Sequence, residues 1–279
     1  MALLTTTGAG ILLPEEVNDL VVVPVTRRSV AYQVSTVVVI GSNSYRIPIL
    51  AEDPSASFVA EGAEIPADDA DIDELEVTPK KCAALSTISR ELASDTINPG
   101  AQDMIGEALA RDSAKVIDRA FFGTTTPNGP SGLKSLTGVA EIDAGSLTNL
   151  DAFAEGQSMA ETVGAATSFW VASPATALQL GQLKEATGSN RPLLQPDPTK
   201  PGRRLIHGVP LLVSEAVDDF TVWGIPQAFS FVVQAQEATL DVSTDAFFTS
   251  DKVAVKTTLR VAFGWPHKEA IVKIEHGGS

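Results

Sequence analysis

Residues 97–122 have the sequence INPGAQDMIGEALARDSAKVIDRAFF, the longest helical pattern in the chain. At 1.5 Å per residue such a helix is roughly 35–40 Å long, so we expect it to be the spine of its domain. Gly123 follows at the position where a C-terminal glycine belongs. The apolar residues recur at spacings of three and four, which is typical of a helix that buries one face; they are Ile97, Ala101, Ile105, Ala108, Leu109, Val116, Ala120 and Phe121.

The chain after this helix mixes strands and helices. Its second predicted helix has clear boundaries, because Ser173 can cap it, Pro174 suits its first turn and Gly188 can end it. Residues 253–264 alternate between apolar and polar, which predicts a long half-buried strand, and 270–275 are expected to return beside it as a hairpin partner. The remaining predicted elements are helices at 150–163 and 173–188 and strands at 169–172, 209–213, 220–223 and 229–233.

The chain before the spine helix is expected to begin with a β-hairpin. Strand patterns at 34–40 and 44–50 flank the turn Gly41-Ser42-Asn43, and residues 77–88 are predicted to return as a further strand. Two short helices are also expected, at 14–20 and 90–94. Because the chain contains both helical and strand patterns, we predict an α+β fold.

A strongly acidic stretch lies between these strands. Residues 51–76 contain ten Asp and Glu side chains and no Lys or Arg, in a chain whose formal net charge is −15. One interpretation is a solvated loop, which is the usual meaning of a charge run. The other is an extended arm that binds a neighbouring subunit. Phe58, Val59 and Ile65 favour the arm, because a purely solvated loop has no use for large apolar side chains.

Composition excludes several classes of protein. An apolar content of 44% in 279 residues supports one large or two modest domains. The longest apolar runs fall far short of the ~20 residues that a helix needs to cross a bilayer. The balance of 20 basic against 35 acidic residues argues against a free-standing nucleic-acid binder, because affinity for phosphates needs cations. The single cysteine, Cys82, excludes a disulfide framework and a cysteine-based zinc site.

No catalytic or metal-binding motif stands out. The sequence contains no GxxxxGK phosphate loop, no GxSxG nucleophile elbow and no HExxH zinc motif, and its three histidines are dispersed. Asp69, Asp71 and Asp73 imitate the first ligands of a calcium loop, but Glu74 and Lys80 stand where that loop needs glycine and glutamate. We therefore expect no catalytic residues, no resident metal and no cofactor.

Four local patterns follow one another in a recognisable order. FVAEGAEIP (58–66) is followed by ISRELASDT (88–96), then by WVASPATALQLGQLKEATG (170–188), and then by HGVPLLVSEAV (207–217) with FTVWGIPQAF (220–229). In this order the chain resembles the major capsid proteins of tailed bacteriophages, of the Hong Kong 97 type. The four patterns look like the tip of that family's extended loop, the entry to its spine helix, and two strand-containing units of its axial domain.

The resemblance implies a Hong Kong 97-like α+β fold and its division into parts. The implied parts are an N-terminal arm at 1–30, an extended β-hairpin loop at 31–80 with an acidic tip at 51–76, a peripheral domain at 81–146 and 234–279 with the spine helix at 97–122, and an axial domain at 147–233.

The resemblance also implies a structural, non-enzymatic protein of the virion. Such a protein would assemble with itself, in the host cytoplasm, into hexamers and pentamers that form an icosahedral head around double-stranded DNA, without sequence-specific binding and without a membrane. Implied partners are a portal and decoration proteins. Because the sequence starts at Met1 with no scaffolding segment before the fold, we expect a separate scaffolding protein.

Other functions remain open at this stage. An encapsulin-type protein compartment, which shares the fold, is the main alternative, and the contents of the shell would distinguish the two. An unrecognised α+β hydrolase that binds calcium in the acidic loop lacks any supporting motif. A phage tail or decoration protein does not need so long a spine helix.

The extended loop departs from the family in one respect. Members that join their subunits covalently carry a lysine near this position, whereas Glu61 and Glu64 occupy it here and no lysine lies between Arg46 and Lys80. An isopeptide bond needs an amine, so we expect a non-covalent shell.

The loop is expected to contact neighbouring subunits through Phe58, Glu61, Glu64 and Ile65. Its carboxylates need basic partners on the neighbour. Because exposed ion pairs contribute up to about 1 kcal/mol each, this pairing would set register more than strength. The candidate partners are Arg27, Arg28, Arg90, Arg203 and Arg204.

Overall fold

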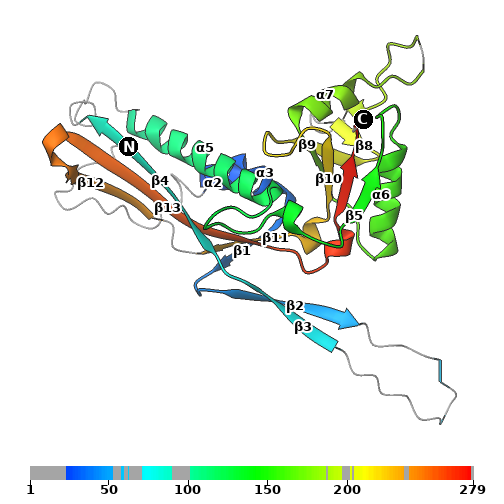
Figure 1. Cartoon of the computed structure of the whole chain (residues 1–279), viewed down its shortest axis with the longest axis horizontal. Helices are drawn as coiled ribbons and strands as arrows, with labels where there is room; N and C mark the ends of the chain where they lie inside the picture. Colours follow the sequence, from blue (N-terminus) through cyan, green and yellow to red (C-terminus); the bar gives the residue numbers. More distant parts are fainter. Residues whose placement is uncertain are drawn as a thin grey trace.

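The structure is a computed structural model of an elongated molecule with two main sheets and a protruding hairpin (Figure 1). It describes residues 23–52, 58–59, 62, 71–89, 101–186, 188–196, 202, 204–235 and 239–277. A five-stranded sheet and the long helix α5 (Ala101–Phe122) form an extended body, and a seven-stranded sheet lies at one end of it.

The five-stranded sheet joins strands that are far apart in the sequence. Its order is β1-β11-β13-β12, and β4 pairs with β13 along the other side of that strand. Strand β1 runs parallel to β11, whereas the other pairs are antiparallel. The strands are β1 (Thr36–Ile40), β4 (Lys80–Ser89), β11 (Phe231–Ala235), β12 (Thr239–Phe247) and β13 (Lys252–Gly264).

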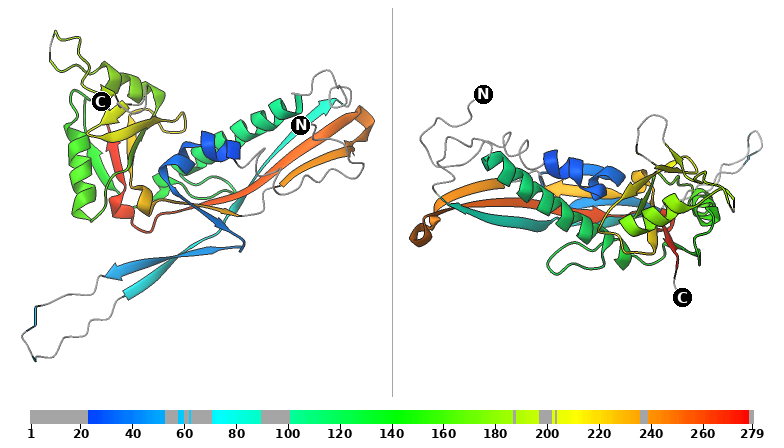
Figure 2. Two further views of the ribbon diagram at one scale, coloured as in Figure 1. Left: turned by 180° about the vertical axis from the view of Figure 1, so that it is seen from behind. Right: turned by 90° about the horizontal axis from the view of Figure 1, so that it is seen from above.

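Helix α5 covers one face of this sheet, with the short helices α2 (Val23–Arg28) and α3 (Val30–Val34) beside it (Figure 2). Ala110, Ala114, Ile117 and Phe121 lie on its buried face at helical spacing. The Phe121 ring meets Phe263 of β13 edge to face, with ring centroids 5.0 Å apart. The layer between α5 and the sheet is therefore the main core.

The seven-stranded sheet has its own core. Its helix α6 packs through Phe153, whose ring meets Trp170 edge to face at 5.0 Å. The strand order is β5-β14-β10-β6-β9-β8-β7. The elements are β5 (Ala140–Asp143), α6 (Asp151–Thr162), β6 (Phe169–Ala172), α7 (Pro174–Gln182), β7 (Gln195–Pro196), β8 (Arg204–Ile206), β9 (Val209–Val213), β10 (Thr221–Ile225) and β14 (Val272–Glu275).

A separate two-stranded hairpin, β2 (Tyr45–Glu52) and β3 (Asp71–Val77), extends away from both sheets. Its base packs through Ile47 and Val77 against Ala262 of β13. Four short 3-10 helices complete the described elements: η2 (Leu133–Ser135), η3 (Gln227–Phe229), η4 (Phe248–Ser250) and η5 (Lys268–Ala270).

Local signals placed most elements correctly. The spine helix predicted over 97–122 is described from Ala101 to Phe122, and residues 97–100 lie outside the described part. The Ser173 hydroxyl accepts a hydrogen bond of 3.2 Å from Thr176 N, which confirms the predicted cap. The helix that it caps ends at Gln182 rather than Gly188, because the chain turns back there and Leu193 N donates to Leu183 O.

The predicted buried face of the spine helix is partly wrong. Val116 is 41% exposed and Ala108 is exposed, whereas Ala110 and Ala114 are buried. Between Ala108 and Val116 the buried face of the helix is therefore rotated relative to the predicted one. It includes small alanine side chains as well as large apolar ones.

Two predicted hairpins are wrong. Residues 36–40 pair with β11, not with 45–52, and the latter strand pairs with β3. Residues 272–275 do not return beside β13; they lie between β10 and β5 in the other sheet. In both cases the observed partner is distant in the sequence. The strand predicted over 77–88 divides at Thr78-Pro79 into β3 and β4, because proline has no N–H to donate to a strand ladder.

The boundaries implied for the parts also change. Residues 23–30, predicted as arm, include the fully buried Val25 and Ser29. Ala31, Tyr32 and Val34 pack in the main core, and residues 36–40 pair with β11 rather than within the hairpin. Strands β5 and β14 belong to the seven-stranded sheet, and β11 to the five-stranded one. The predicted helices at 14–20 and 90–94 lie outside the described residues.

Candidate subunit interface

The β2–β3 hairpin projects from the body, as Figure 1 and the left view of Figure 2 show. Its base is held closely. A Cβ added to Gly264 would lie 2.6 Å from Ile47 Cδ1 and 3.1 Å from Val77 Cγ2, so the glycine lets the hairpin lie directly against β13. The hairpin is therefore fixed at its base, and the strands beyond the base extend into solvent.

The described part of the hairpin is acidic and exposed. Arg46 forms an ion pair of 3.1 Å with Glu74, with both side chains more than half exposed. Asp73 accepts a hydrogen bond of 2.8 Å from the Glu74 backbone, and Glu76 is exposed. The Arg46–Glu74 pair is a surface pair, and pairs of this kind contribute little on their own.

The predicted contact residues are only partly described. The Phe58 side chain is fully exposed, and Val59 is 37% exposed. Glu61, Glu64 and Ile65 lie outside the described residues. An exposed phenylalanine at the far end of a charged hairpin is the feature that distinguishes this surface from a simple solvated loop.

The predicted basic partners do not form one cluster. Arg28 pairs with Glu107 of its own chain at 3.1 Å, and Arg204 donates from Nη1 to Ala177 O at 2.6 Å. Arg27 is exposed on α2. These arginines come from different parts of the molecule, and Arg90 and Arg203 lie outside the described residues.

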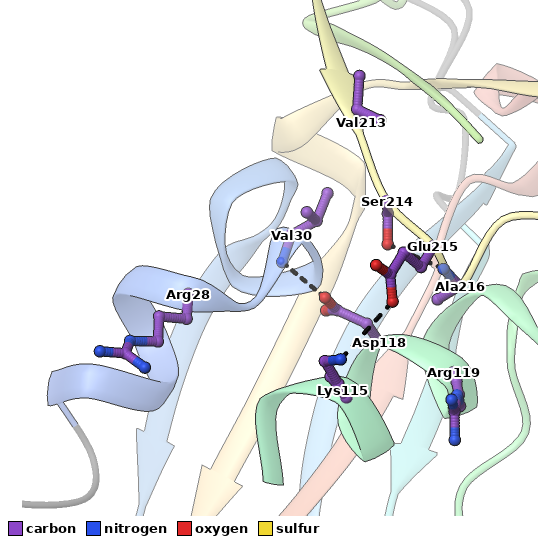
Figure 3. A pocket seen from close by; sticks show the side chains of 9 residues that line it. All are labelled: Arg28, Val30, Lys115, Asp118, Arg119, Val213, Ser214, Glu215 and Ala216. Carbon is purple, nitrogen blue, oxygen red and sulfur yellow. Dashed lines mark hydrogen bonds and ion pairs between the residues drawn. The ribbon is translucent and has the colours of Figure 1, made fainter. Parts of the chain in front are cut away.

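A buried carboxylate fixes the chain directly after Arg27 and Arg28. Asp118 on α5 accepts hydrogen bonds from Ser29 Oγ at 2.6 Å, Ala31 N at 3.0 Å and Val30 N at 3.1 Å, and so caps α3 (Figure 3). Burial raises the pKa of the Asp118 carboxyl, and these hydrogen bonds oppose that rise. The arrangement ties the N-terminal helices to the spine helix.

A small cavity of about 160 Å³ lies beside this carboxylate, between α5 and the loop after β9 (Figure 3). Lys115 and Glu215 form an ion pair of 3.6 Å across the two elements, with both side chains well exposed. The cavity is lined by charges of both signs, so it favours no single ligand.

Sequence reasoning missed a pair of cations on the five-stranded sheet. Lys81 of β4 and Arg260 of β13 are direct cross-strand partners, and both are exposed. Nothing in the sequence could have brought them together, because their proximity depends on the register of two strands that are distant along the chain.

The cysteine and histidine side chains of the described part of the chain lie in structural positions. No group of three or more His, Cys, Asp or Glu side chains there could hold a metal ion. Burial raises the pKa of the Cys82 thiol, and the charge of Asp112 adds to the rise, so the thiol stays protonated. Each histidine contacts an oxygen of the scaffold: His207 meets Leu150 O, His267 meets Val163 O, and His276 meets Thr176 Oγ1.

No helix within the described ranges is both long enough and apolar enough to span a membrane.

Comparisons of the sequence and of the structure with known proteins both find similarity to phage proteins. The chain matches the phage capsid family model over residues 9–276. A chain from Microbacterium phage Oxtober96 has a TM-score of 0.72 at 15% identity, over 99% of this chain and 96% of that one. A chain from Mycobacterium phage Adephagia has a TM-score of 0.70 at 14% identity, over 90% and 91%. No curated protein sequence matches.

A particle structure is also similar. A chain from the capsid of an empty GTA particle, computed with C5 symmetry, has a TM-score of 0.70 at 16% identity, over 100% of this chain and 95% of that one. At such identities the likeness establishes a shared fold.

Proposed function

The chain belongs to the phage capsid family, and we propose that it is the major capsid protein that forms the icosahedral head around double-stranded DNA. The fold predicted from the sequence, of the Hong Kong 97 type, is confirmed by the likeness to the phage structures. In the proposal the chain assembles with itself into hexamers and pentamers in the host cytoplasm and remains in the virion.

The projecting β2–β3 hairpin is the observation that carries this proposal. Among the described residues of the hairpin, Ile47 and Val77 at its base are packed, whereas Phe58 is exposed. Closed shells need contacts in which one patch meets a different patch on the next copy, and a long hairpin can reach such a patch. Many weak contacts of this kind add up over the subunits of a shell.

The shell is proposed to be non-covalent. The sequence has no lysine between Arg46 and Lys80, so the hairpin segment between these residues carries no amine for an isopeptide bond. Phe58, Glu61, Glu64 and Ile65 are the proposed contacts on the hairpin, and they act through burial and charge rather than through a bond.

The overall charge suits a container for DNA. With a net charge of −15, the subunit as a whole repels a polyanion, and a lining that does not bind phosphates allows DNA to enter and leave. A scaffolding protein, a portal and decoration proteins are the further partners that we propose for this assembly.

The proposal is tested by electron microscopy of negatively stained particles from the chain expressed alone and with candidate scaffolding proteins of its phage. We expect hexamer and pentamer rings or hollow shells. On a denaturing gel the same fractions should give a single band near 29.2 kDa. Bands at multiples of that mass would contradict the non-covalent shell.

Particle contents separate the two shell functions. Particles from infected cells should show the ultraviolet absorbance of packaged nucleic acid, whereas a co-purifying enzyme in place of DNA would favour the encapsulin-type compartment. A chain that stays monomeric under all of these conditions would contradict both functions.

A further inference from the structure

Exposed side chains mark one face of the five-stranded sheet on strands β4 and β13. In β13, Leu259 and Val261 are buried in the core with α5, so Arg260 between them points to the opposite face. Lys81 is its cross-strand partner and lies on the same face. Leu85 lies four residues further along β4, on the same face, and is 60% exposed.

The two cations are not balanced by a carboxylate in the described part of the chain. Neither Lys81 nor Arg260 has an ion-pair partner among the described residues, whereas Lys256 on the same face of β13 pairs with Asp241 of β12 at 2.8 Å. Like charges directly opposite each other on antiparallel strands are destabilising. In a chain with a net charge of −15, two adjacent cations form a local positive site that suits an acidic group approaching from outside.

We infer that the Lys81–Arg260 pair receives the carboxylates of the acidic hairpin from a neighbouring copy of the chain, and that this contact sets the register between subunits. The inference rests on the proposed function and names the surface that the hairpin meets. It replaces the scattered arginines predicted from the sequence with one defined site.

Charge and apolarity both select the hairpin as the occupant. Residues 51–76 carry ten acidic side chains and no basic one, which is the complement of the cation pair. The hairpin also exposes Phe58, and the same face of the sheet exposes Leu85, four residues along β4 from Lys81. A second copy of the chain carries both features, the acidic side chains and the exposed phenylalanine, and neighbouring copies are abundant during assembly.

The first test is zero-length carbodiimide cross-linking, which joins an amine to a carboxylate in direct contact. Particles are assembled from equal amounts of 14N- and 15N-labelled subunits, so that links between chains show mixed isotopes. We expect mixed links between the peptide that contains Lys81 and peptides from residues 51–76 in particles, and no such links in unassembled subunits.

The second test is the double variant Lys81→Gln/Arg260→Gln. We expect the subunit concentration needed for assembly to rise about fivefold or more, and assembly of the wild type to weaken as salt is raised. Unassembled subunits of the variant should be at least as resistant to urea as the wild type, because a repulsive pair has been removed. The matched control is Arg111→Gln/Lys268→Gln, which removes two exposed cations elsewhere and should leave the assembly threshold unchanged.

Each other outcome overturns the inference. Links from Lys81 confined to one isotope, or an unchanged assembly threshold in a wild type that does assemble, would contradict the docking site and leave the proposed function standing. Binding of unassembled subunits to DNA that the variant loses would identify a different partner for the cations. A wild type that never assembles would overturn the proposed function together with this inference.

Discussion

Asp118 and Ser29 are both buried, and the hydroxyl of Ser29 donates a hydrogen bond of 2.6 Å to the Asp118 carboxylate. The same carboxylate receives the backbone N–H groups of Val30 and Ala31. One side chain of the spine helix therefore satisfies three donors at the entry to α3. This small cluster decides whether the N-terminal helices stay on the body of the subunit.

Replacing Asp118 with alanine should destabilise the subunit strongly. Two buried donors and one half-buried donor would lose their acceptor, so we expect the free energy of unfolding to fall by about 3 kcal/mol. Urea denaturation of unassembled subunits measures this. Asp112→Ala, at an exposed position of the same helix, is the control and should change the free energy by less than about 0.5 kcal/mol. A loss below about 1 kcal/mol in Asp118→Ala would contradict the role of the cluster.

His276 should make stability depend on pH. It is buried, and burial lowers its pKa below the ordinary value of 6.5. The unfolded chain therefore binds more protons than the folded one between these two pKa values, so stability falls as the pH drops below about 6.5. His276→Gln does not titrate and should show a shallower decline between pH 7.5 and 5.5 in urea denaturation. Parallel curves for the two proteins would contradict this assignment.

Gly132→Ala should prevent normal folding. A Cβ at this position would lie well inside 3.0 Å of the carbonyl oxygens of Ala120 and Gly123, and backbone at the end of α5 cannot move aside easily. We expect a loss of about 3 kcal/mol or more, or insoluble protein. The control is Gly181→Ala in α7, whose nearest neighbour would be Arg204 at 3.6 Å and which should be neutral or slightly stabilising in thermal unfolding. Equal melting temperatures for the two variants would contradict the steric argument.

Phe58→Ser should separate assembly from stability. The ring is fully exposed, so the unfolding free energy of the isolated subunit should change by less than about 0.5 kcal/mol. The concentration needed for assembly, measured by sedimentation, should rise because an apolar contact with the neighbour is lost. Phe58→Leu keeps the apolar contact and should assemble nearly as the wild type does. Unchanged assembly by Phe58→Ser would show that the hairpin tip makes no important contact.

Signals that lie within a short segment predicted local structure well. The Ser173-Pro174 pair marks the start of α7, and alternation marks β13 almost from end to end. The same is true of α5, where helical spacing extends over several turns. These patterns reflect backbone capping and the burial of one face, and both depend on neighbours in sequence.

Strand pairing could not be predicted in the same way. Tyr45–Glu52 would form a hairpin with Thr36–Ile40 if only nearby partners existed, but β11 offers β1 a buried neighbour from a distant part of the chain. The Lys81–Arg260 pair depends on the register of β4 against β13, so it could not be predicted from the sequence. The candidate contacts at the hairpin tip were accessible from the sequence, because acidic charge and isolated apolar residues are properties of composition.

The central claim is that copies of this chain form a closed shell in which each hairpin lies on a neighbour. A cryo-electron microscopy reconstruction of particles assembled from the full chain tests it most directly. We predict hexamers and pentamers in one closed shell, with every β2–β3 hairpin on the next copy and no density for a covalent link. Particles in which each hairpin folds back on its own subunit, or open filaments without pentamers, would contradict the account.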